Sequence, residues 1–234
     1  MPDFQVHTLE GTQFVEVHLN NETFRAEAGA LAYFTGDIEM RSRVIPSLLG
    51  LVKSVLADEA IFRPTYTGTG VVTLESSFGG FHILDLNGKD RWILEPGAYW
   101  ASDASVDVTF FRESFATAYW AGEGLIYLQT QVKGTGKVVL TTPGPVEEIT
   151  LEKGKKVAVE GRAVICRTSG VTMTIRRPTK NYLGKFTAGE QYLRVFEGEG
   201  KIILNPAPYW RYRMMQDINN NSPSASLQNI TIKM

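Results

Sequence analysis

Three glutamates recur in the same short pattern along the chain, and their regular placement is its clearest candidate for binding chemistry. Glu59, Glu123 and Glu190 each follow Ala-Asp or Ala-Gly. If the three positions are equivalent in the fold, the carboxylates form a ring that binds a cation or an amine. A carboxylate beside glycine also accepts backbone N–H bonds at a turn, which is its more common role. Both interpretations stay open, and they apply equally to a second set, Glu27, Glu95 and Glu160.

The other reactive residue types lack the spacing that catalysis or metal binding needs. The three histidines, His7, His18 and His82, form no close pair with a nearby carboxylate, as a metal site on a β scaffold would require. Cys166 follows Val-Ile in an apolar run and is predicted to be a core thiol. We therefore predict no catalytic residue, no metal and no cofactor. A weaker alternative is an enzyme that uses the repeated glutamates, for which Glu123→Gln would abolish activity and leave the fold intact.

Basic and aromatic side chains toward the C-terminal end form the candidate surface for nucleic acid. Arg176 adjoins Arg177, and Trp210 adjoins Arg211. Such residues together neutralise phosphates and stack on single-stranded bases. The chain has 24 Lys and Arg against 25 Asp and Glu, so no overall basic excess supports this surface. RNA or nucleotide binding is therefore the alternative function rather than the preferred one.

A Gly-x-Gly sequence follows each Ala-x-Glu pattern, with a period of about 65 residues. The glycine pairs are Gly68/Gly70, Gly134/Gly136 and Gly198/Gly200. Between 61 and 204, β-branched and aromatic residues alternate with polar ones in short runs, which is typical of strands. The glycine pairs lack a following helix and Lys-Ser/Thr, so we interpret them as turn or bulge positions and not as a phosphate loop. The sequence predicts an all-β fold of three fused small antiparallel units.

The two ends of the chain carry complementary halves of this repeat. We predict units at 57–120, 121–187 and 188–215, the last completed by 1–40. The result is one compact unit over 1–215 with pseudo-threefold repetition, in which N-terminal strands pair with C-terminal ones. Such closure removes exposed sheet edges. Residues 217–234 are predicted to form a polar tail with one last strand.

One segment departs from the β pattern. Apolar residues recur with helical spacing over 45–56, and Pro46 suits the first turn of a helix. We predict a short helix at 45–56 that packs on the β core or contacts another subunit, and that is too short to span a membrane. The candidate contact residues are Leu48, Leu49, Val52 and Leu56.

Composition is typical of soluble intracellular proteins. Of 234 residues, 43% are hydrophobic and 21% are charged, which is enough for an ordinary core. The single cysteine rules out an internal disulfide and is typical of a reducing compartment. The N-terminus lacks the basic and apolar segments of a secretory signal, so we predict a cytoplasmic location.

Several motifs in order resemble one known family. They are the run from Ser47 to Phe62, Thr-Gly-Thr-Gly-Val-Val from Thr67, Glu-Pro-Gly-Ala-Tyr-Trp-Ala-Ser from Glu95, Ala-Gly-Glu-Gly-Leu from Ala121 and Gly-Thr-Gly-Lys-Val from Gly134. Over about 30–215 the chain resembles the altered-inheritance-of-mitochondria-24 family, although Asp58 and Thr69 stand where glycine is commoner. The resemblance implies a fold like the tryptophan RNA-binding attenuation protein, of β-sandwich or double-stranded β-helix type, in oligomeric rings. It implies no catalytic set.

These observations favour a non-enzymatic, homo-oligomeric β scaffold that binds a protein partner or a small ligand. Closed symmetry with three units per chain favours a trimer. The alternative is an RNA- or nucleotide-binding ring.

Overall fold

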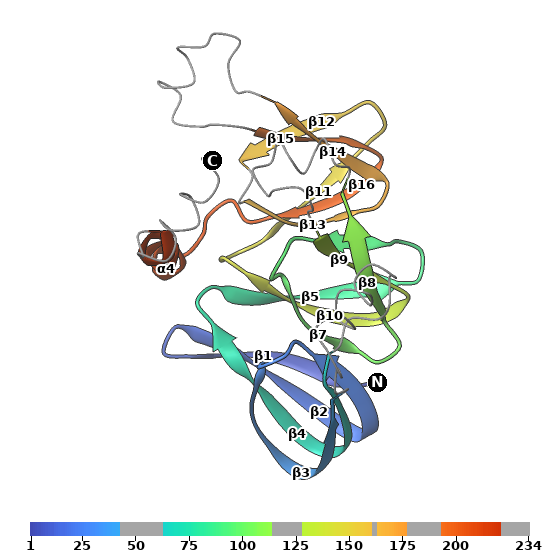
Figure 1. Cartoon of the computed structure of the whole chain (residues 1–234), viewed down its shortest axis with the longest axis vertical. Helices are drawn as coiled ribbons and strands as arrows, with labels where there is room; N and C mark the ends of the chain where they lie inside the picture. Colours follow the sequence, from blue (N-terminus) through green and yellow to red (C-terminus); the bar gives the residue numbers. More distant parts are fainter. Residues whose placement is uncertain (43–62, 114–127, 161–162, 177–192, 221–234) are drawn as a thin grey trace, which may run out of the picture.

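The described part of the chain is almost entirely β-structure (Figure 1). The computed structural model describes residues 1–42, 63–113, 128–160, 163–176 and 193–220. Across these ranges there are sixteen strands and one helix, α4 (Trp210–Asn220). The expectation of an all-β fold is confirmed.

The strands form three antiparallel sheets. The first has the order β3-β4-β2-β7-β10-β5 with β1 paired to β2, the second β11-β16-β13-β6-β9-β8, and the third β12-β15-β14. The first sheet comprises β1 (Asp3–Leu9), β2 (Thr12–Ala26), β3 (Leu31–Arg41), β4 (Thr65–Ser77), β5 (Gly80–Asn87), β7 (Tyr99–Asp103) and β10 (Thr135–Thr142). The second comprises β6 (Trp92–Leu94), β8 (Asp107–Arg112), β9 (Leu128–Lys133), β11 (Glu147–Leu151), β13 (Val164–Thr168) and β16 (Gly200–Leu204). The third comprises β12 (Lys156–Glu160), β14 (Val171–Arg176) and β15 (Leu193–Gly198).

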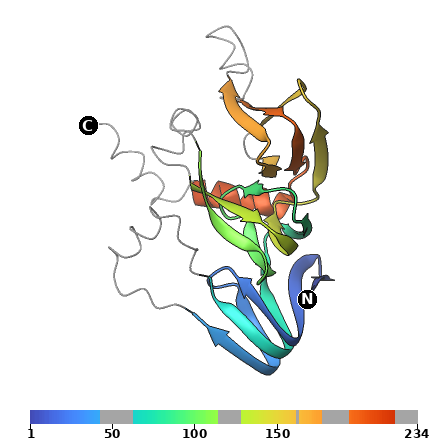
Figure 2. The same cartoon turned by 90° about the vertical axis from the view of Figure 1, so that its right-hand side faces the viewer.

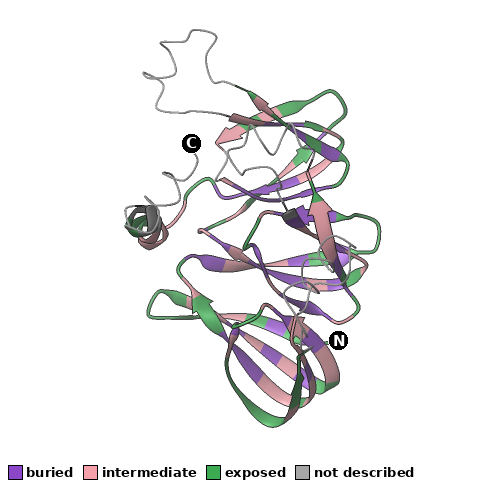
Figure 3. Ribbon diagram, viewed as in Figure 1, coloured by how far each residue is buried: buried purple, intermediate pink, exposed green. Residues whose placement is uncertain are grey.

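Three hydrophobic clusters follow one another along the long axis of the molecule. β1–β4 lie at one end, and β12, β14 and β15 lie at the other (Figures 1 and 2). Phe24 and Tyr66 centre the first cluster, Trp92 the middle one, and Phe196 the third. Buried positions concentrate in the inner strands, whereas β3 is exposed along most of its length (Figure 3). The alternation of buried and exposed residues along the strands follows from their period of two.

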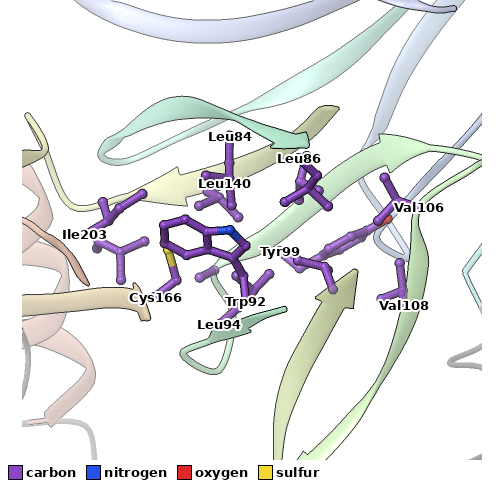
Figure 4. Packing of buried hydrophobic residues seen from close by; sticks show 14 residues of the cluster. Leu84, Leu86, Trp92, Leu94, Tyr99, Val106, Val108, Leu140, Cys166 and Ile203 are labelled. Carbon is purple, nitrogen blue, oxygen red and sulfur yellow. The ribbon is translucent and has the colours of Figure 1, made fainter. Parts of the chain in front are cut away.

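The middle cluster shows why Cys166 is a core thiol, as the sequence predicts. Its side chain lies beside the indole of Trp92, with Leu140 and Ile203 close by (Figure 4). Cys166 is 0% exposed. Burial raises the pKa of the thiol well above its usual range, because the thiolate would lose its hydration.

We therefore expect the native protein to resist thiol reagents. A disulfide-exchange dye at pH 8 should label less than about a tenth of Cys166 in the folded protein, and all of it in guanidinium chloride, because only the exposed thiolate reacts. Rapid labelling without denaturant would contradict the buried placement.

Each Gly-x-Gly lies in or between strands that pair with the strands just before them in the sequence. β4 pairs with β2 and β3. β9 and β10 pair with β5 to β8, and β15 and β16 pair with β11 to β14. The six glycines have φ between +107° and +154°. This is a region that side-chain-bearing residues rarely adopt, so the backbone itself demands glycine there.

These pairings divide the strands into three groups, β1–β4, β5–β10 and β11–β16. One strand in each group carries a β-bulge at a matching place. The pairing shifts by one residue between Leu31 and Tyr33 on β3. It shifts in the same way across Trp100 on β7 and across Ile165 on β13. Each bulge comes five residues after Glu27, Glu95 or Glu160. A bulge bends its strand locally and redirects the side chains around it.

Two short ladders join one group of strands to the next. In the first joint, residues 24–26 of β2 lie opposite residues 101–103 of β7. In the second, residues 92–94 of β6 lie opposite residues 166–168 of β13. The amide beyond each ladder bonds to a bulge: Glu27 N–H donates to Trp100 O at 2.7 Å, and Glu95 N–H donates to Ile165 O at 2.9 Å.

The predicted pairing of 1–40 with 188–215 is wrong. β1, β2 and β3 pair among themselves and with β4 and β7, whereas β15 and β16 pair with β11 to β14. The predicted unit 57–120 is divided for the same reason, because β4 joins β2 and β3 rather than β5 to β8. The two half-repeats combine in the opposite phase to the one expected. Each strand that carries or flanks a Gly-x-Gly pairs with the half-repeat before it in the sequence and not with the half-repeat after it. Pairing between neighbours in sequence is the usual outcome.

The C-terminal segment also differs from the prediction at its start. Residues 217–220 belong to helix α4 and are not part of a polar tail. Apolar residues at Trp210, Met214 and Ile218 recur every fourth position, which is helical spacing. The remaining tail to 234 and the predicted helix at 45–56 lie outside the described residues.

Candidate functional site

A cavity of about 490 Å³ is the strongest candidate site in the part of the chain that the structure describes. Residues 76–79, from the end of β4 to the start of β5, form one wall, and 95–98 between β6 and β7 form another. Residues 141–143 and the side chains of Tyr212 and Met215 on α4 complete it. The cavity therefore lies where separate sheets and the helix come together.

The first turn of α4 is tied to the rim of this cavity. The Arg211 guanidinium donates to the carbonyl oxygens of Phe78 at 2.8 Å and Gly79 at 3.0 Å. It also lies over the ring of Tyr209, 4.5 Å from the centroid. The Tyr209 N–H donates to Pro143 O at 3.0 Å. These contacts hold the start of α4 against the rim after the proline-rich residues 206–208.

A largely buried ion pair forms the polar side of the cavity. Arg194 Nη1 lies 2.7 Å from Glu95 Oε2, and Gln129 Nε2 donates to Glu95 Oε1 at 2.9 Å. The Glu95 and Arg194 side chains are 13% and 11% exposed. Removing two charges from water is costly, so their mutual attraction and the amide bond are needed to offset it. The pair joins β15 to the end of β6 across the second joint.

A similar polar group lies at the first joint. Arg63 Nε donates to Glu27 Oε2 at 3.0 Å, and its Nη2 reaches Thr130 Oγ1 at 3.4 Å. The Arg63 guanidinium also lies 3.9 Å above the centre of the Tyr99 ring. Burial raises the pKa of Tyr99 to about 12, against the lowering effect of Arg63. Glu27 and Glu95 therefore bond to side chains in joints and not simply to backbone at turns.

The remaining lining of the cavity is mainly apolar. Pro96, Ala98, Trp100 and Ile165 line it, with Met215 from the helix. The Trp100 indole nitrogen has no hydrogen-bond partner among the described residues. An apolar pocket with one charged pair is typical of sites for small molecules that have an apolar body and a polar end.

Asp103, opposite Phe24 in the first joint, is a buried acid with an unusual environment. It is 1% exposed, and its Oδ2 accepts the Lys137 N–H at 2.5 Å. Its Oδ1 has no partner within the described ranges. Burial raises the pKa of Asp103, and the Lys137 bond only partly opposes that effect.

This placement predicts a pH-dependent cost. The folded protein binds the Asp103 proton more tightly than the unfolded chain, so this group lowers stability as the pH rises from about 4 through its raised pKa. We expect the unfolding free energy of Asp103→Asn minus that of the wild type to increase over that interval and to stay constant above it. Urea denaturation from pH 3.5 to 8 measures the difference. A pH-independent difference would contradict the assignment.

Most residues predicted from sequence to form a site lie outside the described residues. These are the glutamates Glu59, Glu123 and Glu190, the helix residues Leu48, Leu49, Val52 and Leu56, and Arg177. Of the remaining ones, Arg176 ends β14 and Arg211 binds the cavity rim. Trp210 is 74% exposed at the start of α4.

Sequence reasoning missed the cavity residues other than Glu95. Arg194, Trp100 and Tyr212 come from strands and a helix that are far apart in the sequence. No local pattern connects them. The repeated Glu before Pro-Gly or Ala-Gly was the available signal, because it marks the start of each joint.

Comparison with known proteins identifies the family. The sequence model for mitochondrial biogenesis AIM24 matches residues 4–207. The chain belongs to this family. An uncharacterized protein of Streptococcus pyogenes serotype M6 is 21% identical over 187 residues, covering 76% of this chain and 74% of that protein. A crystal structure of a Streptococcus pyogenes protein superposes with a TM-score of 0.71 at 17% identity, covering 95% of this chain and 100% of the other. That similarity establishes a shared fold.

Two further properties bear on this AIM24-family chain. No described helix is long and apolar enough to cross a membrane. Within the described ranges, no three His, Cys, Asp or Glu side chains gather as metal ligands would.

Proposed function

We propose that this chain is a non-enzymatic, homo-oligomeric β scaffold of the cytoplasm that binds a small ligand or a partner. The observation that carries the proposal is the cavity of about 490 Å³ between the sheets and α4. It combines an apolar lining with the Glu95–Arg194 pair, and so it offers shape and one polar anchor. The single cysteine supports a reducing compartment.

A binding role has more support than a catalytic one. The charged groups at the cavity, Glu95 and Arg194, engage each other, and Gln129 holds the carboxylate. The one thiol of the chain, Cys166, is buried in the core with a raised pKa. An activated nucleophile needs a neighbouring base and access to substrate. Cys166 lacks the access, and Glu95, which does line the cavity, is held by the Arg194 guanidinium and the Gln129 amide, neither of which is a base.

The proposal includes three copies of one β unit with a fold like the tryptophan RNA-binding attenuation protein. Three features support the repetition: the positive φ of all six glycines, the three bulges, and the two similar joints. The units then run over about 12–77, 80–142 and 147–204. Closed assembly of such chains, with a trimer as the expected number, accords with the usual symmetry of homo-oligomers.

The RNA-binding alternative has less support. Arg211 donates to two backbone carbonyls and stacks on Tyr209, so its charge is committed to the rim. Trp210 offers a free ring, but the net charge of −1 supplies no general attraction for phosphates.

Filling the mouth of the cavity tests ligand binding. Ser76→Trp places an indole at an exposed lining position, and Glu75→Trp is its control because Glu75 is also exposed but does not line the cavity. Small molecules released from the denatured protein, purified gently from its own host, are weighed by mass spectrometry. We expect a defined compound with wild type and Glu75→Trp, and its loss with Ser76→Trp. Equal retention by both variants would place the ligand elsewhere, and no compound with any of them would contradict ligand binding.

A further inference from the structure

We propose that chains assemble head to tail, with β12 of one copy pairing antiparallel with residues 33–35 of β3 in the next copy. The contact repeats the ladder that already joins β2 to β7 and β6 to β13 within the chain. This inference rests on the self-association and the repetition proposed above, and it names the surfaces that self-association uses.

In each joint we call the strand just before the glutamate the donor strand, and the strand just after the bulge the acceptor strand. A third copy of the donor strand lies in β12. In the two joints the donor residues 24–26 and 92–94 come immediately before Glu27 and Glu95. Residues 157–159 of β12 come immediately before Glu160. They pair with β15 on one side, as 92–94 pair with β9. Their other side pairs with no described strand.

The acceptor strand also has a third copy. Residues 101–103 and 166–168 follow the bulges at Trp100 and Ile165. Residues 33–35 follow the matching bulge on β3 and pair with β4 on one side. The opposite edge of β3 has no strand beside it in the described part of the chain. Among the described strands, one donor (β12) and one acceptor (β3) are therefore left without a partner strand, each with the form of a half-joint.

Burial distinguishes the used acceptors from the unused one. Ala101, Ser102 and Asp103 are at most 1% exposed, and residues 166–168 are at most 4% exposed. Tyr33 and Phe34, at the matching places, are 57% and 42% exposed. Two aromatic residues on a long open edge strand are an aggregation liability unless another strand covers them.

The two half-joints lie at opposite ends of the long axis, with β3 at one end and β12 at the other (Figure 1). One chain therefore cannot pair them with each other. A second copy can, and the contact is heterologous, so repeated pairing closes into a ring or extends into a filament. The register of the existing joints places Val157 opposite Thr35, Ala158 opposite Phe34 and Val159 opposite Tyr33.

Cysteine pairs test this register. Hydrogen-bonded and non-hydrogen-bonded pairs alternate along an antiparallel ladder. Counted back from the hydrogen-bonded amides of Glu27 and Glu95, the position that matches Val157 is a non-hydrogen-bonded one. Val157–Thr35 is therefore a non-hydrogen-bonded pair, with Cα atoms about 4.5 Å apart. That distance permits a disulfide. Val157→Cys and Thr35→Cys chains of different size are co-expressed and oxidised, and each is also oxidised alone. Cys166 is buried in both.

We expect a covalent dimer of unlike chains, at least tenfold more abundant than any like-chain dimer. Glu39→Cys, on the second half of β3, replaces Thr35→Cys as the control and should not cross-link. A Thr35→Cys dimer with itself would overturn the head-to-tail contact in favour of a twofold one. No cross-link from a protein that is oligomeric by native mass spectrometry would refute this joint and leave the proposed scaffold standing. A monomeric wild type would refute both.

Ala158→Pro provides an independent test. By alternation from Glu27 and Glu95, the Ala158 N–H points away from β15 toward the open edge. Proline removes that donor and leaves the bonds to β15 in place, as on other edge strands. We expect a monomer whose melting temperature lies within about 4 °C of the wild type, a shift of about 1 kcal/mol. An unchanged oligomer would contradict the proposal.

Discussion

Gly68→Ala is expected to melt about 10 °C below the wild type. A Cβ at this position would lie 1.9 Å from the Asp37 carbonyl oxygen, and φ is +145°. Backbone strain and overpacking each cost about 1–3 kcal/mol, and a chain of this length loses about 2–4 °C per kcal/mol. The glycine permits β3 and β4 to cross closely, so the loss is one of fold and not of ligand contact.

A graded series separates crowding from backbone strain. Gly134→Ala meets its nearest atom, Ser105 O, at 3.2 Å, and Gly154→Ala meets nothing within 4 Å although φ is +81°. Thermal melts should rank Gly68→Ala lowest, Gly134→Ala next and Gly154→Ala nearest the wild type, with a cost of about 1 kcal/mol for the last. Equal losses at the three positions would show that close approach of the strands is not the reason for the glycines.

Glu113→Gln should lower the unfolding free energy by about 3 kcal/mol, because it leaves a buried guanidinium without its carboxylate. Arg167 Nη2 lies 2.5 Å from Glu113 Oε2, and the two side chains are 2% and 10% exposed. Arg167 lies opposite Ile93 in the second joint, so this pair also stabilises the connection between groups of strands.

A double-mutant cycle identifies the cause. Arg167→Met in the Glu113→Gln background should recover most of the loss, because an apolar side chain of similar size needs no partner in that place. Glu39→Gln, which breaks the exposed Glu39–Arg41 pair, should change stability by less than about 1 kcal/mol. Urea denaturation measures all four variants. Additive losses for Glu113→Gln and Arg167→Met would contradict a coupled pair.

The strand content could be predicted from the sequence because it is local, whereas Gly68 and Gly70, predicted as turn or bulge positions, lie inside β4. Glycine is the residue type that adopts positive φ, so Gly68 and Gly70 indicate their backbone geometry by residue type alone. The alternation of apolar and polar residues predicts the strands around them. Which half-repeats pair with each other could not be predicted from the sequence. Glu27 and the half-repeat it begins could join the glycine strand before or after it, and only the tertiary contacts of β2 with β4 decide.

The candidate site was predictable only at Glu95. Its repeated context suggested a role, but the partner Arg194 lies 99 residues away and reaches it through the second joint. The cavity depends on where α4 docks, and that position follows from Arg211 bonds to the backbone of Phe78 and Gly79. Side chain to backbone bonds leave no trace in a residue pattern, so the helix and the cavity were both missed.

The head-to-tail contact would explain an otherwise costly feature of the chain. Within the described residues, β12 and β3 are both edge strands. The exposed Tyr33 and Phe34 make residues 33–35 an uncharged part of the β3 edge, which another strand would protect. A scaffold built in this way would place one ligand cavity per chain at regular intervals along the assembly.

Native mass spectrometry of the full chain, purified gently from its own host, tests the central claim of a self-associating binding scaffold most directly. We expect an assembly of several chains, with three as the favoured number, carrying a defined extra mass for each chain. Ala158→Pro should collapse that assembly to single chains that still carry the mass. A wild-type spectrum of bare monomers at micromolar concentration would contradict the scaffold and its head-to-tail contact together.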